Sequence, residues 1–373
     1  MEDNIDNKNI EEVVQIEEEV QNANIETPFN PYLIKIRRDP FTLGQLIDKI
    51  KHNEVNFDTA FQRQHDLWDL EKQSRLIESV LLNLPLPAFY FDETDSKKQL
   101  WNVIDGLQRC SAFNNFIIKK SLTLQNLEFL HDYEVPYDKL PRELQRRIEQ
   151  TPLTVYVVEK GTPDEVKFNI FKRINTGGLV LTPQEIRHAM NQGIPAQYVQ
   201  ELAEMESFKK ATCYKIKSDR MEDRDFVTRY ISFYLIGYKN YQPDLDGFMT
   251  KGMAAIRDCT VAERDTMKAN FDKAMKSAYI IFDNDAFRKR EDEYASRRPI
   301  NKPLFEVFSV LLAQMPEKEL GLLAKRKSLL KKKFIELNKD KVFQYSISSG
   351  TGQKTSVIKR FEEIKRIIQE TLV

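Results

Sequence analysis

The sequence predicts an α+β protein in which a small mixed-sheet domain is followed by an all-helical domain. Strand-like alternation of apolar residues occurs only in the first half of the chain, and helical spacing dominates after residue 195. The 373 residues, 41% of them hydrophobic, can bury a substantial core. At roughly 150 residues for each domain, this length allows two or three domains.

Charge is distributed unevenly, although the formal net charge is zero. Residues 1–26 hold nine acidic residues and one lysine, which predicts a flexible acidic arm. Residues 288–373 hold 20 Lys/Arg and 11 Asp/Glu, typical either of a solvated helix face or of a surface for a polyanion. We therefore expect an acidic arm (1–26), a sheet domain (27–192) and a helical domain with a basic C-terminal part (193–373).

Other features exclude a membrane or secreted protein. No stretch reaches the ~20 apolar residues that a membrane span needs. The N-terminus lacks a signal-peptide pattern, and the three cysteines lie far apart without a C-x-x-C pair. We expect a cytoplasmic protein with no membrane partner.

Strands and helices alternate in the first domain. The strand-like segments are 55–63, 88–93, 99–105 and 153–159. The helical segments are 41–53, 70–84 (stopped by Pro85), and 107–118. The strands 88–93 and 99–105 are separated by a short polar stretch, which predicts a hairpin.

Two threonine-proline pairs predict helix starts with capping boxes, one at Thr162 and one at Thr182. Between them lies an Arg-Ile-Asn-Thr-Gly-Gly loop (173–178), whose glycines can adopt positive φ. Beyond residue 195 the periodicity predicts helices at 195–206, 224–237, 262–282, 302–314, 317–336 and 356–371.

The Asp-Gly-Leu-Gln-Arg motif (105–109) joins a strand to a helix. A helix start and an Arg fork both favour an anion such as phosphate. Asp105 could hold a metal or a water, and Gln108 could contact a phosphate or sugar oxygen. For these five residues alone, a structural role as an N-cap, a turn glycine and a surface charge is the better interpretation.

Two further segments offer phosphate ligands. Arg63 could bind phosphate, or it could pack on Trp68. The 173–178 loop could approach a ligand with its backbone, whereas a helix C-cap would explain only one of its two glycines. Cys110 lies near a helix start, where a thiol pKa can fall, but a buried small side chain is the better interpretation.

Four blocks, FQRQHDLW, RLIESVLLNLPLPAFYF, VIDGLQRCSAF and FKRINTGGLVLTPQEIRHA, together resemble the N-terminal domain of GmrSD-type restriction endonucleases, within the ParB/sulfiredoxin-like superfamily. They cover about residues 40–190. The closing YSISSGTGQKTSVIKRFEEI resembles the C-terminal end of that family. The resemblance implies a ParB/sulfiredoxin-like nucleotide-binding domain over 27–192.

The resemblance also implies binding of an NTP (GTP, CTP or ATP) with Mg²⁺, its hydrolysis, and action on DNA in a restriction or anti-phage system. The family signature is Asp-Gly-Gln-Gln-Arg. Leu107 stands at its first Gln, which leaves open whether this chain is an NTPase. The residues expected to act in catalysis are Asp105, also the metal ligand, Gln108 and Arg109.

The motifs, the resemblance and the basic C-terminal part together predict one set of nucleotide-binding residues and one set of DNA contacts. The expected nucleotide-binding residues are Arg63, Gly106, Arg109, Ser111, Arg173, Asn175, Thr176, Gly177 and Gly178. The expected DNA contacts are Lys325, Arg326, Lys327, Lys331, Lys332 and Lys333.

The family often carries an HNH-type nuclease domain, but His188 is the last histidine here. We therefore expect a separate nuclease subunit as a partner, and an oligomer remains possible. Two alternatives stay open: a non-catalytic DNA-binding or regulatory module, which Leu107 favours, and a metal-dependent nuclease acting through Asp105, for which no motif is visible.

Overall fold

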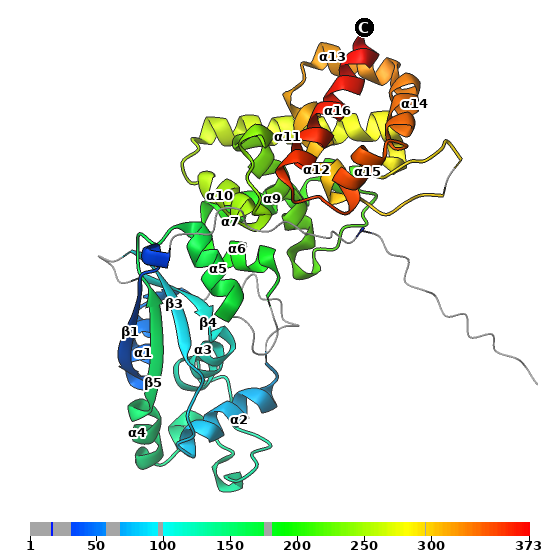
Figure 1. Ribbon diagram of the computed structural model, residues 1–373. Helices are drawn as coiled ribbons and strands as arrows, with labels where there is room; N and C mark the ends of the chain where they lie inside the picture. Colours follow the sequence, from blue (N-terminus) through cyan, green and yellow to red (C-terminus); the bar gives the residue numbers. More distant parts are fainter. Residues whose placement is uncertain (1–15, 18–30, 57–67, 96–99, 175–180, 295) are drawn as a thin grey trace, which may run out of the picture. The chain divides into compact units, whose positions relative to one another are not determined.

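The computed structural model describes residues 16–17, 31–56, 68–95, 100–174, 181–294 and 296–373. The chain forms two compact units. Phe29–Met190 is the sheet unit, and Asn191–Val373, together with the described residues 16–17, is the helical unit (Figure 1). The predicted α+β class, with strands first and helices after, is confirmed.

The sheet unit contains a five-stranded mixed sheet in the order β1-β5-β3-β4-β2. The strands are β1 (Ile36–Thr42), β2 (Val55–Asn56), β3 (Phe89–Asp95), β4 (Leu100–Asp105) and β5 (Pro152–Val158). β3 pairs antiparallel with β4, so the predicted hairpin is confirmed. β5 is parallel to β3 and antiparallel to β1.

Strand β1 has no counterpart in the predicted elements. It lies at the edge of the sheet and carries Arg37, Arg38, Asp39 and Pro40. Charged residues and proline are tolerated at an edge, and they hide the apolar alternation that marks inner strands. The prediction for 55–63 is confirmed only at β2, because the rest lies outside the described residues.

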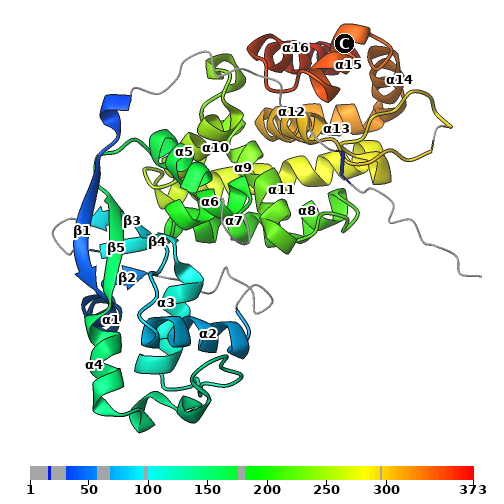
Figure 2. The ribbon, with the colours of Figure 1, turned by 60° about the horizontal axis from the view of Figure 1, so that its bottom comes forward.

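Helices pack on both faces of this sheet (Figure 2). They are α1 (Leu43–Lys51), α2 (Leu70–Leu81), α3 (Leu107–Phe113), α4 (Arg142–Gln150), α5 (Asp164–Ile174) and α6 (Pro183–Met190). Trp101 and Val103 of β4 join the core with α1–α3, whereas Ile104 joins a smaller core with α5 and α6. Successive side chains of β4 therefore point to opposite faces of the sheet and contribute to two different cores.

In the sheet unit, the structure corrects two helix predictions and adds one helix that was not predicted. The helix expected over 107–118 ends at Phe113 and continues as a π-helix, Asn114–Ile118. The capping box at Thr182 forms, with Glu185, but the buried Thr162 hydroxyl makes no hydrogen bond within the described residues. Helix α4 has no predicted counterpart, because its residues are mostly charged and only Ile148 is fully buried.

The described residues of the helical unit share one apolar core. Its helices are α7 (Ile194–Glu204), α8 (Glu206–Ala211), α9 (Glu222–Leu235), α10 (Leu245–Ala255), α11 (Val261–Phe282), α12 (Lys302–Gln314), α13 (Glu317–Lys325), α14 (Lys327–Leu337), α15 (Lys341–Ser348) and α16 (Lys354–Leu372). The predicted helix 317–336 is in fact two helices, α13 and α14, that meet at Arg326.

A buried ionic cluster ties three of these helices together. Glu306 of α12 is fully buried and accepts hydrogen bonds from Arg360 Nε of α16 at 2.6 Å and from Arg229 Nη1 of α9 at 3.1 Å. Arg360 also donates to the carbonyls of Ser346 and Thr351. The four polar contacts compensate the burial of these charges.

Two residues of the expected acidic arm are described, and both contact the helical unit. Ile16 forms a β-bridge with Ile300, and the Glu17 carboxylate pairs with Lys289 and Asn301. The rest of the arm, as well as the expected boundary at residue 27, lies outside the described residues. Among the described helices, none is both long enough and apolar enough to cross a bilayer.

Candidate functional site

The Asp105–Arg109 turn joins β4 to α3 through a glycine in the left-handed conformation. Gly106 has φ 100° and is the N-cap of α3. A Cβ at this position would lie 2.6 Å from Cδ1 of Phe89, so the turn requires glycine for both its φ angle and its space. The N–H groups at the start of α3 have no acceptors inside the helix and can receive an anion.

Arg109 is buried and held within the protein. Its guanidinium donates to the carbonyls of Pro87 and Ala88, the latter at 3.1 Å, and to Asp105 Oδ2 at 3.0 Å. It also lies 4.3 Å from the Phe89 ring centroid. Burial lowers its pKa, and Asp105 opposes that change. These contacts make Arg109 the group that fixes the turn against β3.

Asp105 remains partly open to solvent. Its side chain is 32% exposed, and one carboxylate oxygen takes the ion pair with Arg109. Across the hairpin lies Tyr90, which stacks on Tyr156 with ring centroids 5.1 Å apart. Burial, Tyr156 and Asp105 raise the pKa of Tyr90. Within the described residues, the second carboxylate oxygen of Asp105 makes no hydrogen bond or ion pair.

Gln108 anchors the chain that leads into α2. Its Oε1 accepts from the backbone N–H of Trp68 at 3.0 Å. The Trp68 carbonyl accepts from Gln73 Nε2 at 2.7 Å, and Gln73 Oε1 accepts from Asn115 at 3.0 Å. Sequence reasoning singled out Gln108 but missed Gln73 and Asn115, since polar residues on a helix give no signal until their partners are known.

The other predicted phosphate ligands lie mainly outside the described residues: Arg63, Asn175, Thr176, Gly177 and Gly178. The described residues on either side of these segments can be placed. Trp68 is tied to Gln108, while Ile174 and Leu181 pack against the small core that contains Ile104, next to Asp105. Arg173, in the last turn of α5, is exposed.

Cys110 and Ser111, the two α3 residues that follow Arg109, are both buried but differ in chemistry. Ser111 is buried, and its hydroxyl has no hydrogen-bond partner within the described residues. Cys110 is fully buried, which raises its pKa to about 12. A thiol in this state is protonated at physiological pH, in keeping with its interpretation as a small core residue.

Metal binding at Asp105 is not supported by a ligand cluster. Within the described ranges, no group of three or more His, Cys, Asp or Glu side chains could hold a metal ion. A magnesium ion at Asp105 would therefore complete its coordination with phosphate oxygens and water, as Mg²⁺ commonly does.

The layer of α5 and α6 contains buried charges that sequence reasoning missed. Lys167 Nζ of α5 donates to Asp92 Oδ1 of β3 at 2.6 Å, and both side chains are buried. In the sequence, Lys167 lies between Val166 and Phe168, two buried apolar residues. This position could have indicated a buried lysine. The pair fixes α5, which leads to the glycine loop, on the sheet.

The predicted DNA contacts surround the junction of α13 and α14, but they are not equivalent. Lys325, Lys327 and Lys332 are exposed. Lys333 pairs with Glu370 at 2.7 Å, and Arg326 donates to the Thr371 carbonyl at 2.9 Å. These last two contacts hold α16, so the cations most available to a polyanion are the exposed lysines and Lys331.

Residues 43–191 match the protein family described as GmrSD restriction endonuclease, N-terminal domain. This is the family that the four sequence blocks resemble, so the resemblance is confirmed for this segment. The match includes the whole Asp105–Arg109 turn and the α5–α6 connection. The search of curated proteins found no match to the chain.

Proposed function

Because residues 43–191 form a GmrSD-type N-terminal domain, we propose that the sheet unit binds a nucleoside triphosphate with Mg²⁺ and that the chain acts on DNA in a restriction or anti-phage system. The observation that best supports this is the left-handed Gly106 turn, which sets a partly exposed Asp105 beside the start of α3. A carboxylate and a helix start are complementary to a magnesium-bound phosphate.

The proposal gives the motif residues different roles. Asp105 offers its second oxygen to the metal, directly or through water. Arg109 is a positioning residue, because its guanidinium is occupied by Asp105 and by two carbonyls. Gln108 holds Trp68, and so fixes the end of the segment that carries Arg63. Arg63 and residues 173–178 would then complete the phosphate site.

One observation favours a second candidate, a module that binds nucleotide without hydrolysing it. Leu107 replaces the first Gln of the family signature, and its side chain packs against the apolar core with α1–α3. It therefore offers no polar group to orient a water. In this form the chain would regulate or recruit a separate nuclease subunit.

Thermal unfolding with GTP, CTP and ATP, each with and without Mg²⁺, tests the proposal. A ligand at 100 times its Kd stabilises the folded state by about 2.7 kcal/mol. We expect one nucleotide to raise Tm in the presence of Mg²⁺, and Asp105→Asn to remove the magnesium-dependent part. Phosphate release then separates the hydrolysing from the non-hydrolysing form.

Asp138→Asn is a matched control, because this carboxylate is exposed and pairs with Lys120 on the surface. It should leave the nucleotide-induced shift unchanged. If no nucleotide raises Tm, or if Asp105→Asn and Asp138→Asn behave alike, the assignment of the site is wrong.

A further inference from the structure

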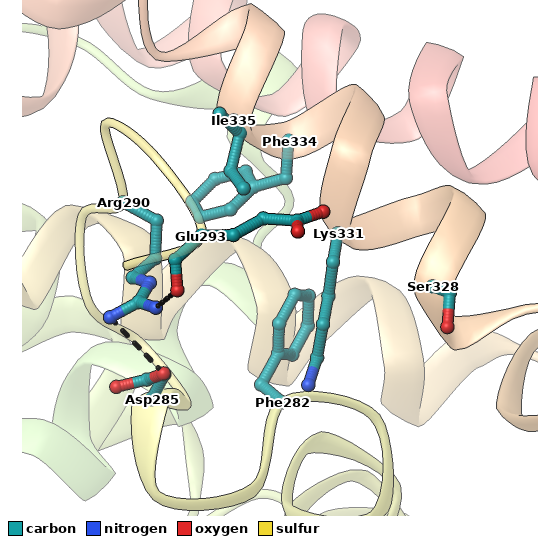
Figure 3. Close-up of a pocket in the computed structure, with 8 residues that line it drawn as sticks. All are labelled: Phe282, Asp285, Arg290, Glu293, Ser328, Lys331, Phe334 and Ile335. Carbon is teal, nitrogen blue, oxygen red and sulfur yellow. Dashed lines mark hydrogen bonds and ion pairs between the residues drawn. The ribbon is translucent and has the colours of Figure 1, made fainter. Parts of the chain in front are cut away.

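A cavity of about 240 Å³ lies in the helical unit beside α14. Figure 3 shows its lining, which comes from the end of α11, the 285–293 segment and α14. Phe282, Phe334 and Ile335 supply apolar surface. The two Phe rings meet edge to face, with centroids 5.9 Å apart, and belong to the core, so this surface is rigid.

Polar groups stand around this apolar surface. Figure 3 shows the Lys331 side chain running toward Phe282, with its nitrogen next to Phe282, and the Glu293 carboxylate near the backbone end of Lys331. Ser328 lies at one end of the lining. Within the described residues, the side chains of Lys331, Glu293 and Ser328 make no hydrogen bond or ion pair. The cavity thus presents a donor, an acceptor and a hydroxyl whose side chains are unpaired in the part of the chain that the structure describes.

Charge in the cavity is balanced. Arg290 pairs with Asp285 at 3.4 Å and donates to the Glu293 carbonyl at 2.8 Å. Lys331 is matched in charge by Glu293. A free anion would therefore meet as many carboxylates as cations, whereas a neutral ring with donors and acceptors on its edge would match the lining.

The size of the cavity narrows the ligand further. Its volume is below the ~300–1,000 Å³ of sites for drug-sized ligands, which suits a single ring system and not a whole nucleotide. Lys327 and Lys331 lie one helical turn apart on α14, and Lys325 and Lys332 add exposed positive charge nearby. Phosphates of a nucleic acid bound there would bring a base to the cavity.

We propose that this cavity receives a nucleobase turned out of a DNA strand, with the ring on the Phe282–Phe334–Ile335 surface and its polar edge on Lys331 and Glu293. Enzymes that inspect or modify single bases use such pockets, and the hydrogen bonds to the base edge give selectivity. The inference rests on the DNA contact of the proposed function and extends it from the phosphates to the base.

The test uses the full chain and a DNA duplex with 2-aminopurine in a mismatched pair, because this base fluoresces more strongly once unstacked. We expect binding to raise the fluorescence several-fold. Lys331→Ala should reduce this increase about tenfold, as should Glu293→Ala, while Lys318→Ala, at an exposed position of α13, should keep it. Both lysine variants remove one positive charge from the helical unit, so the loss of a charge by itself cannot explain a difference between them.

Far-ultraviolet circular dichroism and Tm of each variant confirm folding; Glu293 is exposed and Lys331 is half-buried, so both positions should tolerate alanine. DNA binding without a fluorescence increase, or an increase that Lys331→Ala leaves intact, overturns the base pocket and leaves the proposed function standing. Absence of DNA binding overturns the pocket and the DNA contact together, whereas nucleotide binding is judged separately by the Tm shift described above.

Discussion

At the scale of one residue, Gly106 explains why the Asp105–Arg109 turn contains a glycine. The residue combines a positive φ with direct contact to the Phe89 ring, so it meets two requirements that no other amino acid satisfies. Asp105, the last residue of β4, and Arg109, in the first turn of α3, form an ion pair across this turn. The identity of Gly106 therefore controls the placement of both charged groups.

Replacing Gly106 with Ala should destabilise the protein through backbone strain and through the clash with Phe89. The strain alone is worth about 1–3 kcal/mol. Gly161→Ala is the control, because Gly161 has φ 94° and a Cβ there would meet nothing within 4 Å. Urea unfolding should show a larger loss for Gly106→Ala, and equal losses would contradict the importance of the Phe89 contact.

At the scale of elements, the α2–α3 pair is joined by a chain of amides. Gln108, the Trp68 backbone, Gln73 and Asn115 form consecutive hydrogen bonds between the two helices. Because Trp68 lies just before α2, these hydrogen bonds fix the start of α2 against α3. The amides therefore affect the candidate site indirectly, because they fix the position of α2 relative to α3.

Gln73→Ala and Gln108→Ala should each cost about 1 kcal/mol of stability, the usual worth of a hydrogen bond. Both act on Trp68, so the double variant should differ from the sum of the single variants by about 0.5 kcal/mol or more. Denaturant unfolding of the four proteins measures this coupling. Gln73→Ala combined with Gln145→Ala, on helix α4, should be additive; strict additivity of the first pair would argue against the amide chain.

At the scale of the whole molecule, each unit has its own interior, and that of the helical unit includes charge. Glu306, Arg229 and Arg360 come from helices far apart in the sequence and meet where solvent is excluded. Such a cluster adds little net energy compared with apolar packing, but removing one member leaves an uncompensated charge. It therefore fixes how α9, α12 and α16 fit together.

Arg360→Ala should reduce the free energy of unfolding by about 3–5 kcal/mol, because Glu306 would stay buried without its main partner. Arg366→Ala on the same helix should cost about 0–1 kcal/mol, since its pairs with Glu363 and Glu370 lie on the surface. Thermal and urea unfolding would compare the two. Similar losses would mean that the cluster contributes nothing beyond surface pairing.

Patterns that repeat within a few residues were sufficient to predict much of this structure. The apolar stripes of α2 and α11, the β3–β4 hairpin and the capping box at Thr182 follow from periodicity and local chemistry. Strand β1 and helix α4 were not predicted, because their charged residues hide the periodic spacing of apolar residues. The break at Arg326 escaped because apolar spacing continues across it.

The sequence by itself determined that a sheet domain precedes a helical domain, that a strand-to-helix turn lies at Gly106, and which family residues 43–191 resemble. Only the tertiary structure decided that Arg109 is bound by carbonyls, that Lys167 meets Asp92, and that Lys331 lines a cavity. The physical reason is range: turns and helices depend on neighbours along the chain, whereas a side chain's partners come from segments that only folding brings together.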